Sequence, residues 1–253
     1  MGLLLEGKHA FVTGGSGGIG RALCVRFAKL GAEVAFSYFS DHDAADATVA
    51  AIKDASGGRG PTVLRASLAE AKASDELAAE LLAAFPKIDV FVSNAASGVL
   101  RNATELTAKH WDWTIGVNAR AFLLLANHII PKMPPGGRIL ALSSAGATKA
   151  IPLYASIGAS KAALEATVRH YALELASKGI TVNTISPGIV ETGALEHFPH
   201  KDELISIAKM RTPMGRLATP EDVADVAELL VSPLSRMITG QTIIVDGGYS
   251  VLG

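Results

Sequence analysis

A tyrosine and a lysine seven residues apart, Tyr154 and Lys161, are the side chains best suited to chemistry in this sequence. They lie at the start of a stretch that we expect to be helical. Seven residues make about two helical turns, so both side chains return to the same face. A phenol can donate a proton or a hydrogen bond, and a nearby ammonium group favours its ionised form. Ser144, ten residues before the tyrosine, could contact a substrate carbonyl or cap a strand.

A glycine-rich run near the N-terminus indicates a binding site. Residues 13–20 read Thr-Gly-Gly-Ser-Gly-Gly-Ile-Gly, which places glycine at positions 14, 18 and 20. The run follows an apolar strand-like segment and opens a helix-like one. Glycines there let the backbone turn sharply and approach a pyrophosphate at a helix N-terminus. The position of the run, more than its composition, predicts that it binds a dinucleotide.

The elements that must position these residues can be predicted from the apolar pattern. Short, nearly continuous apolar runs are typical of parallel strands buried on both faces, and they span residues 9–13, 34–38, 62–66, 89–93, 138–143, 181–186 and 242–246. Helix-like stretches lie between them, near residues 18–30, 42–56, 70–84, 104–130, 156–177, 201–209 and 220–231. This alternation predicts one α/β domain over residues 1–253, a Rossmann-type doubly wound sheet of about seven parallel strands with helices on both faces.

Composition excludes several classes of protein. The chain has 253 residues, 49% hydrophobic and 19% charged, with a formal net charge of −1, so it has neither a disordered composition nor the positive field that binds nucleic acid. Its mean hydropathy is +0.32, but no apolar run approaches the roughly 20 residues of a membrane span. One cysteine, Cys24, no evident signal peptide and scattered histidines lead us to expect a cytoplasmic protein without a metal site.

Further short motifs follow one another in a characteristic order along almost the whole chain. They are Asn94-Ala95-Ala96, Asn118, Ser143-Ser144, Lys161, Pro187-Gly188 and Val245-Asp246-Gly247-Gly248. With the glycine-rich run, this order and spacing resembles the short-chain dehydrogenase/reductase superfamily. The cofactor-binding residues that the resemblance implies are Gly14, Ser16, Gly18, Ile19, Gly20, Tyr38, Ser67, Asn94, Ala95, Lys161, Pro187, Gly188 and Thr192. The catalytic residues that it implies are Tyr154, Lys161, Ser144 and Asn118, with Lys161 on the nicotinamide ribose and Asn118 as a helix-kinking, water-holding residue.

The spacing of the tyrosine and lysine departs from most of that superfamily, which carries Tyr-x3-Lys. Here Ile157 stands four residues before Lys161 and cannot donate a proton, whereas Tyr154 starts roughly 4.5 Å further away. In carbonyl reduction, hydride and proton reach adjacent atoms. In enoyl thioester reduction, hydride adds to the β-carbon and charge collects on the thioester oxygen, two atoms further along than in carbonyl reduction. A more distant acid therefore suits conjugate reduction.

Tyr-x6-Lys is also similar to the enoyl-acyl-carrier-protein reductase III branch, as are segments 94–101, 110–114, 158–166 and 193–199. This resemblance implies reduction of an enoyl thioester, carried by acyl-carrier protein or coenzyme A, in fatty-acid or polyketide biosynthesis. Pro187 is more typical of ketoreductases and keeps a second reading open, a carbonyl or imine reductase of specialised metabolism. A non-catalytic dinucleotide-binding regulator is a third, which intact Tyr154 and Lys161 disfavour.

The end of the second predicted strand bears on the choice of cofactor. An NAD enzyme carries a carboxylate there for the ribose diol, but Tyr38 occupies that position, followed by Phe39 and Ser40. Gly17 replaces the basic residue that many NADP-binding members carry. Ser16, Ser37, Ser40 and His42 could supply donors or be ordinary turn residues. The missing acid removes a repulsion against a 2′-phosphate, so the sequence favours NADPH.

Three further expectations concern surfaces. Wide apolar faces on the helices at 104–130 and 156–177 match the four-helix interface of a homotetramer in the family that the chain resembles. Trp111 and Trp113 are expected to pack helix against helix. Segment 193–215 is a candidate lid over an acyl chain, with Leu195, Phe198, Leu204, Ile205 and Met210 on its apolar face.

Overall fold

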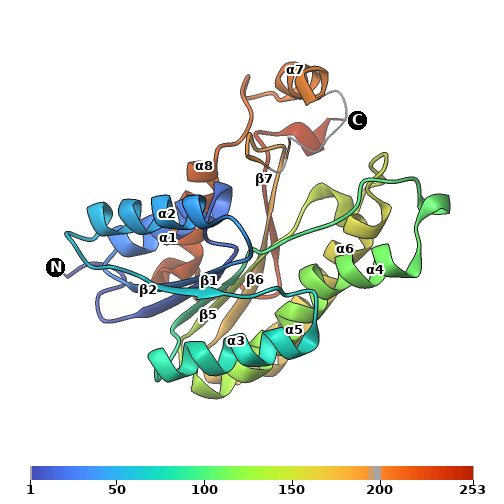
Figure 1. Ribbon diagram of the computed structural model, residues 1–253. Helices are drawn as coiled ribbons and strands as arrows, with labels where there is room; N and C mark the ends of the chain where they lie inside the picture. The colour runs from blue at the N-terminus through green and yellow to red at the C-terminus, as the bar shows by residue number, and fades with distance from the viewer. Residues whose placement is uncertain (1, 194, 196–200, 253) are drawn as a thin grey trace.

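Seven parallel strands form a single sheet in the order β3-β2-β1-β4-β5-β6-β7 (Figure 1). The computed structural model describes residues 2–193, 195 and 201–252. The strands are β1 (His9–Thr13), β2 (Glu33–Tyr38), β3 (Thr62–Arg65), β4 (Val90–Ser93), β5 (Arg138–Leu142), β6 (Thr181–Pro187) and β7 (Thr242–Val245). The strand order reverses at β1 and β4. Ligands of doubly wound sheets bind outside the carboxyl ends of the strands at such a point.

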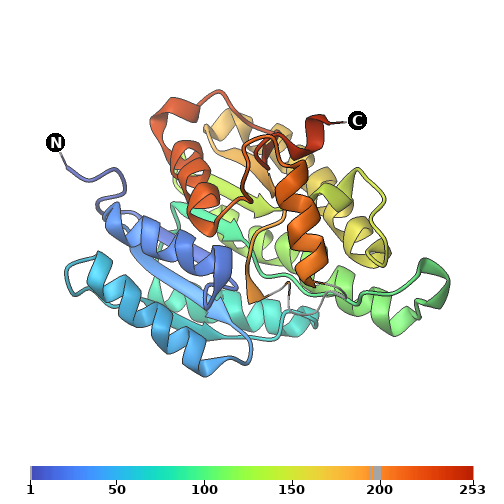
Figure 2. The ribbon, with the colours of Figure 1, turned by 90° about the horizontal axis from the view of Figure 1, so that it is seen from above.

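Helices cover both faces of the sheet, as Figures 1 and 2 show from two sides. The α-helices are α1 (Gly18–Lys29), α2 (His42–Ala55), α3 (Ala71–Ala84), α4 (Ala108–Ile115), α5 (Ala121–Ile129), α6 (Ala155–Leu175), α7 (Lys201–Arg211) and α8 (Pro220–Val231). Helices α1, α2 and α8 lie on one face, and α3, α5 and α6 on the other. The single-domain Rossmann-type α/β fold predicted from the sequence is confirmed.

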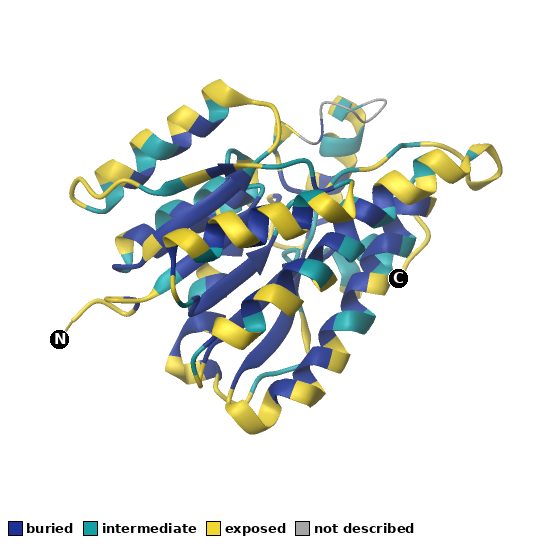
Figure 3. Ribbon diagram, turned by 60° about the horizontal axis from the view of Figure 1, so that its bottom comes forward, coloured by how far each residue is buried: buried dark blue, intermediate teal, exposed yellow. Residues whose placement is uncertain are grey.

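Two buried clusters hold the layers together, one on each face of the sheet. Phe11, Phe91 and Phe122 stack in the cluster beneath α3, α5 and α6, whereas Phe27 and Phe36 are fully buried in the cluster beneath α1 and α8. Figure 3 shows the buried strands flanked by helices whose outer faces are exposed. Because the strands are buried on both sides, their sequences are continuously apolar rather than alternating.

The helix predicted near 104–130 is divided in the structure. A 3-10 turn at Ala103–Glu105 comes first, and α4 begins only after Thr107, whose hydroxyl accepts a hydrogen bond from the backbone N–H of His110 at 3.4 Å. A π-helical turn, Gly116–Arg120, then joins α4 to α5. Such turns inside helices are often found at functional sites. The cause here is Asn118, described below.

Short 3-10 turns complete the elements at Ile130–Lys132, Ala145–Ala147, Ala176–Lys178, Pro233–Ser235 and Tyr249–Val251. In Figure 1, α7 stands above both helix layers. None of the helices within the described ranges is long and apolar enough to cross a membrane.

Candidate active site

The glycine-rich turn joins β1 to α1 and has the backbone that a bound pyrophosphate needs. Gly14 and Gly18 have φ values of +66° and +50°, which side chains with a Cβ rarely adopt. A Cβ on Gly20 would overlap the Gly14 carbonyl. The N-cap of α1 is Gly17, which has no side chain that could accept hydrogen bonds from the first turn. The N–H groups of that turn are therefore available to a ligand. The turn therefore fits a dinucleotide.

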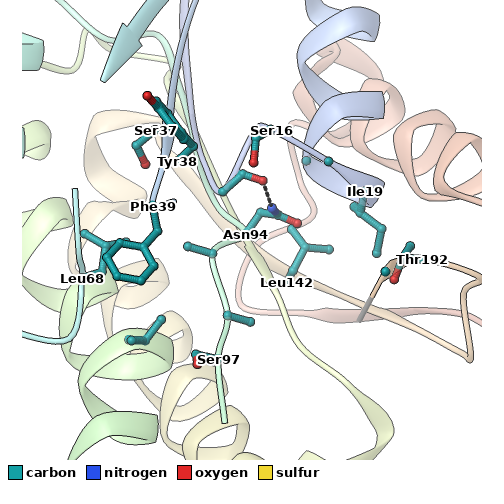
Figure 4. A pocket seen from close by; sticks show the side chains of 18 of the residues that line it. Ser16, Ile19, Ser37, Tyr38, Phe39, Leu68, Asn94, Ser97, Leu142 and Thr192 are labelled. Atoms are coloured by element: carbon teal, nitrogen blue, oxygen red, sulfur yellow. Dashed lines mark hydrogen bonds between the residues drawn. The ribbon is translucent and has the colours of Figure 1, made fainter. Parts of the chain in front are cut away.

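Asn94 ties the carboxyl end of β4 to this turn. Its Nδ2 donates to the carbonyls of Thr13 and Gly14 at 3.0 and 2.9 Å, as Figure 4 shows for one of these bonds. The Thr13 hydroxyl accepts from the backbone N–H groups of Asn94 and Ala95, each at 3.0 Å. The two strands that flank the reversal of the sheet are thus fixed against each other, directly below the cleft.

A cleft of about 570 Å³ runs along the carboxyl ends of the strands. The predicted site residues that line it are Gly14, Ser16, Gly18, Ile19, Gly20, Tyr38, Ser67, Asn94, Ala95, Ser144, Tyr154, Lys161, Pro187 and Thr192. Figure 4 shows Phe39 and Leu68 toward one end and Ile19 and Thr192 toward the other. The structure thus brings the predicted cofactor residues and Tyr154, Lys161 and Ser144 into one space.

Two predicted residues do not line the cleft, Gly188 and Asn118. Gly188 donates its N–H to the Val245 carbonyl at 2.9 Å, and a Cβ there would come within 2.9 Å of Asp246 Cβ. The prediction that Gly188 contacts the cofactor is therefore not supported by its position. Its lack of a side chain lets β6 and β7 approach each other.

Asn118 links the π-helical turn to the loop after β4 through hydrogen bonds. Its Oδ1 accepts from the backbone N–H of Ser97 at 2.8 Å, and its Nδ2 donates to the Ser97 carbonyl at 2.9 Å and to the Ser160 hydroxyl at 2.8 Å. Both ends of the amide are engaged in a buried site, so the helix opens locally to let the side chain reach the loop. The expected helix irregularity is present, but the side chain binds protein groups and not the cleft.

Lys161 is buried and lines the cleft. Its Nζ donates to the Leu142 carbonyl at 2.7 Å, and the residue is 5% exposed. Burial lowers the pKa of Lys161 to about 8, and the negative charge of Glu165 acts in the opposite direction. The lysine therefore changes its charge within the pH range in which enzymes are assayed.

Tyr154 is the N-cap of α6 and packs its ring on the backbone of Gly146, where a Cβ would come within 2.6 Å of the ring. Burial raises the pKa of the phenol, and the hydroxyl of Ser144 lowers it. The Ser144 oxygen is itself buried, with no well-formed hydrogen bond among the described residues. Leu153, just before the tyrosine, has a φ of +62°, and its carbonyl accepts from Arg101 N–H at 2.9 Å. That strained residue turns the chain into α6.

A polar pair that the sequence did not predict stands at the end of β2, between Tyr38, which lines the cleft, and His42, which does not. Tyr38 Oη and His42 Nδ1 lie 2.8 Å apart, and Phe39 presents an exposed ring beside them. Asp41 is the one carboxylate among the described lining residues, and its side chain accepts from Ala44 N–H at 2.9 Å as the N-cap of α2. No described carboxylate stands at the end of β2 itself.

Sequence reasoning missed two features of the site. Trp113 lines the cleft, is 39% exposed and donates its Nε1–H to Ser97 Oγ at 2.8 Å, so the expectation that it packs helix against helix is wrong. Glu165 is buried and accepts from the Ser143 hydroxyl at 2.6 Å. The sequence signal for Glu165 was its position one helical turn after Lys161.

The lid prediction is only partly described. Gly193 lines the cleft, Leu195 is buried, and Lys209 of α7 pairs with Glu191 at 2.7 Å. Phe198 lies outside the described residues, as do 194, 196, 197, 199 and 200. Over the described ranges, no group of three or more His, Cys, Asp or Glu side chains could hold a metal ion.

Comparisons with known proteins agree with this geometry. The sequence model of a family described as "Enoyl-(Acyl carrier protein) reductase" matches residues 14–250. A 1-cyclohexenylcarbonyl-CoA reductase of Streptomyces collinus is 37% identical, over 96% of this chain and 87% of that protein. Versicolorin reductase 1 of Aspergillus parasiticus is 32% identical over 96% of this chain and 97% of its own length.

Solved structures show the same relationship. A short-chain dehydrogenase/reductase from Serratia marcescens superposes with a TM-score of 0.90 at 32% identity, covering 98% of this chain and 99% of that one. LugOII, described as a promiscuous reductase that catalyses keto-reduction at C1 during lugdunomycin biosynthesis, has a TM-score of 0.86 at 37% identity, with 97% and 99% coverage. The chain belongs to the short-chain dehydrogenase/reductase superfamily and is an oxidoreductase of its reductase type.

Proposed function

We propose that the protein reduces the 2,3 double bond of an enoyl thioester with NAD(P)H. The observation that carries this proposal is the position of its acid. Tyr154 caps α6 and lines the cleft, whereas Ile157, four residues before Lys161, is buried and absent from the lining. A proton donor displaced from the ribose-binding lysine suits the thioester oxygen, which lies two atoms further from the carbon that receives hydride than the oxygen does in carbonyl reduction.

The chain's own groups fit the charge that such a reaction develops. A nicotinamide cofactor, when bound along the cleft, supplies the hydride, which adds to the β-carbon. The electron pair of the double bond moves to the thioester oxygen as an enolate. Tyr154 donates a hydrogen bond to that oxygen, and the buried Ser144 hydroxyl is the second donor. Protonation of the α-carbon, with the proton given up by Tyr154 and replaced from solvent, then restores the thioester carbonyl and completes the saturated product.

In this proposal Lys161 acts on both the cofactor and Tyr154. Its position in the lining of the cleft suits a contact with the nicotinamide ribose hydroxyls. Its positive charge favours the ionised form of the Tyr154 phenol, whose pKa burial otherwise raises. The two groups thus act as one unit, with the lysine setting the readiness of the tyrosine to give up its proton.

NADPH is the proposed cofactor. No carboxylate among the described residues stands at the end of β2 to repel a 2′-phosphate, and Asp41 is already engaged as the cap of α2. Tyr38 and His42 supply polar atoms at that end. We further propose a homotetramer assembled through the outer faces of α4, α5 and α6, where Trp111, Leu123 and Leu173 are exposed.

A keto-reducing alternative has specific support. LugOII, described as catalysing keto-reduction, is as similar to this chain as the 1-cyclohexenylcarbonyl-CoA reductase, both at 37% identity, and versicolorin reductase 1 is 32% identical. The position of transferred hydrogen separates the two functions. With NADPH deuterated at the transferred position, enoyl reduction of crotonyl-CoA puts deuterium on C3 of butyryl-CoA. Deuterium found only at a carbinol carbon, with acetoacetyl-CoA as substrate and no product from crotonyl-CoA, would favour the alternative.

A further inference from the structure

Two residues on successive turns of α6 form hydrogen bonds with the carboxyl end of β5. The Leu142 carbonyl accepts from Lys161 Nζ at 2.7 Å, and the hydroxyl of the next residue, Ser143, donates to Glu165 Oε1 at 2.6 Å. Ser143 is also fixed through its backbone, because its N–H donates to the Ile185 carbonyl of β6 at 2.8 Å. Ser144 is the next residue in the chain, so these hydrogen bonds also fix the position of the Ser144 hydroxyl.

The carboxylate of Glu165, which accepts one of these hydrogen bonds, is buried. Glu165 is 8% exposed and Ser143 5%, on the side of α6 that faces the sheet. Burying a carboxylate is costly unless it is hydrogen-bonded and paired with a positive charge. Here the hydrogen bond comes from Ser143, and the positive charge is Lys161, one helical turn away and just as buried.

The other described groups around the lysine are neutral. The end of β5 contributes Leu142, Ser143 and Ser144, and the π-helical turn contributes the neutral amide of Asn118, which donates to the hydroxyl of Ser160 at 2.8 Å. The titratable Tyr154 begins the same helix. Among the described residues, Glu165 is the charged group that acts on Lys161 against the effect of burial.

We propose that Glu165, held by the Ser143 hydroxyl, is a positioning residue that keeps the Lys161 ammonium charged and directed along the end of β5. This inference rests on the proposed function for the task of the lysine, and it assigns a role to a residue that touches neither the cleft nor the reacting atoms. Glu165 acts through Lys161, and Lys161 acts on Tyr154.

The test measures the titration of Lys161 itself, in cofactor-free protein. The lysine side chains are labelled with ¹³C at the ε-carbon and followed by NMR from pH 5.5 to 10.5, and the Lys161 signal is assigned by its loss in Lys161→Ala. Glu165→Gln keeps the shape and the acceptor for Ser143 but removes the charge. Because the ammonium loses its counter-charge, we expect its titration to fall by about one to two pH units. Glu174→Gln, an exposed site on the same helix, is the matched control and should leave it unchanged.

Turnover gives the second readout. With the lysine titrating about one unit lower, the fraction still charged at pH 8 falls from about half to about a tenth. We therefore expect kcat/KM of Glu165→Gln to fall at least fivefold at pH 8 and to approach the unmodified value at pH 6. A residue that only supports the fold would lower activity equally at both pH values, and that result would overturn the proposal.

A second variant covers the case in which Glu165→Gln does not fold. Ser143→Ala combined with Glu165→Leu replaces the buried polar pair by apolar groups, a change that folded proteins often tolerate. It lacks the same charge, so the Lys161 titration should fall as far. An unshifted titration in either folded variant refutes the inference, whatever the substrate. A shifted titration in an enzyme that fails to reduce crotonyl-CoA supports the inference and refutes the proposed function.

Discussion

Ile157 packs on the backbone of Gly98 so closely that a Cβ added to Gly98 would overlap its Cγ1. The side chain therefore points at the loop after β4, and not into the cleft. A proton donor at position 157 has no room in this chain, since the loop already fills the space. The displacement of the acid to Tyr154 is built into the packing of two segments about 60 residues apart in the sequence.

Replacing Ile157 by tyrosine should therefore not produce a working ketoreductase. The larger ring must displace the loop at Gly98, and overpacking of this kind costs about 1–3 kcal/mol. We expect the melting temperature of Ile157→Tyr to fall by several degrees, with no gain in reduction of acetoacetyl-CoA. Leu234→Tyr, at an exposed position outside the proposed subunit interface, should leave the melting temperature within a degree or two. A stable Ile157→Tyr protein with new ketoreductase activity would show that the loop at Gly98 can move to make room for the ring, and would contradict this prediction.

Lys161→Ala should remove nearly all turnover. The ribose-binding cation and the charge that assists Tyr154 are lost together, and a buried hydrogen bond to the Leu142 carbonyl goes with them. We expect kcat/KM to fall to less than about a tenth of the unmodified value, a loss of more than about 1.4 kcal/mol in transition-state stabilisation. Cofactor binding, measured by fluorescence titration of NADPH, should weaken as well. A variant that retains more activity than this contradicts the role given to the lysine.

The activity should depend on pH through the same lysine. Burial depresses the pKa of Lys161 to about 8, so the ammonium is charged below that pH and loses its proton as the pH rises through it. Since kcat/KM reports the free enzyme, it should be level near pH 7 and decline above about pH 8. A profile of kcat/KM from pH 6 to 10, with the folded state checked by circular dichroism, measures this. Activity that stays level to pH 10 would contradict the assignment.

Cofactor preference should respond to charge at the end of β2. Tyr38→Asp places a carboxylate where the ribose diol of NADH would be bound and where a 2′-phosphate would be repelled. We expect the unmodified protein to oxidise NADPH in preference to NADH, and the variant to prefer NADH. The ratio of the two kcat/KM values at fixed substrate measures the change. Faster oxidation of NADH by the unmodified protein at equal concentration would show the proposed preference to be wrong.

Much of the fold could be predicted because its signals are local. Strands buried on both faces are continuously apolar, and the glycines at 14 and 18 are required by the backbone itself. The interruption of the helix near 116 is expected only from the family resemblance at Asn118, and no local pattern of its own residues predicts it. It depends on Asn118 reaching Ser97, 21 positions earlier in the chain, and such a contact leaves no periodic pattern.

The same distinction holds within the site. Tyr154 and Lys161 are separated by two helical turns and could be paired from spacing alone. The Ser143–Glu165 hydrogen bond joins the end of a strand to a helix across 22 positions, and Trp113 of α4 donates to Ser97 in the loop after β4. Residues that act through tertiary contacts are the ones that spacing does not reveal.

The most direct test of the proposed function compares crotonyl-CoA with acetoacetyl-CoA in one assay. NADPH oxidation is followed at equal enzyme and cofactor concentrations, and kcat/KM is determined for each thioester, with Tyr154→Phe measured in parallel. The proposal predicts at least a hundredfold preference for crotonyl-CoA, with most of that activity lost in Tyr154→Phe because the enolate oxygen loses its donor. Equal or faster reduction of acetoacetyl-CoA by the unmodified protein would contradict it.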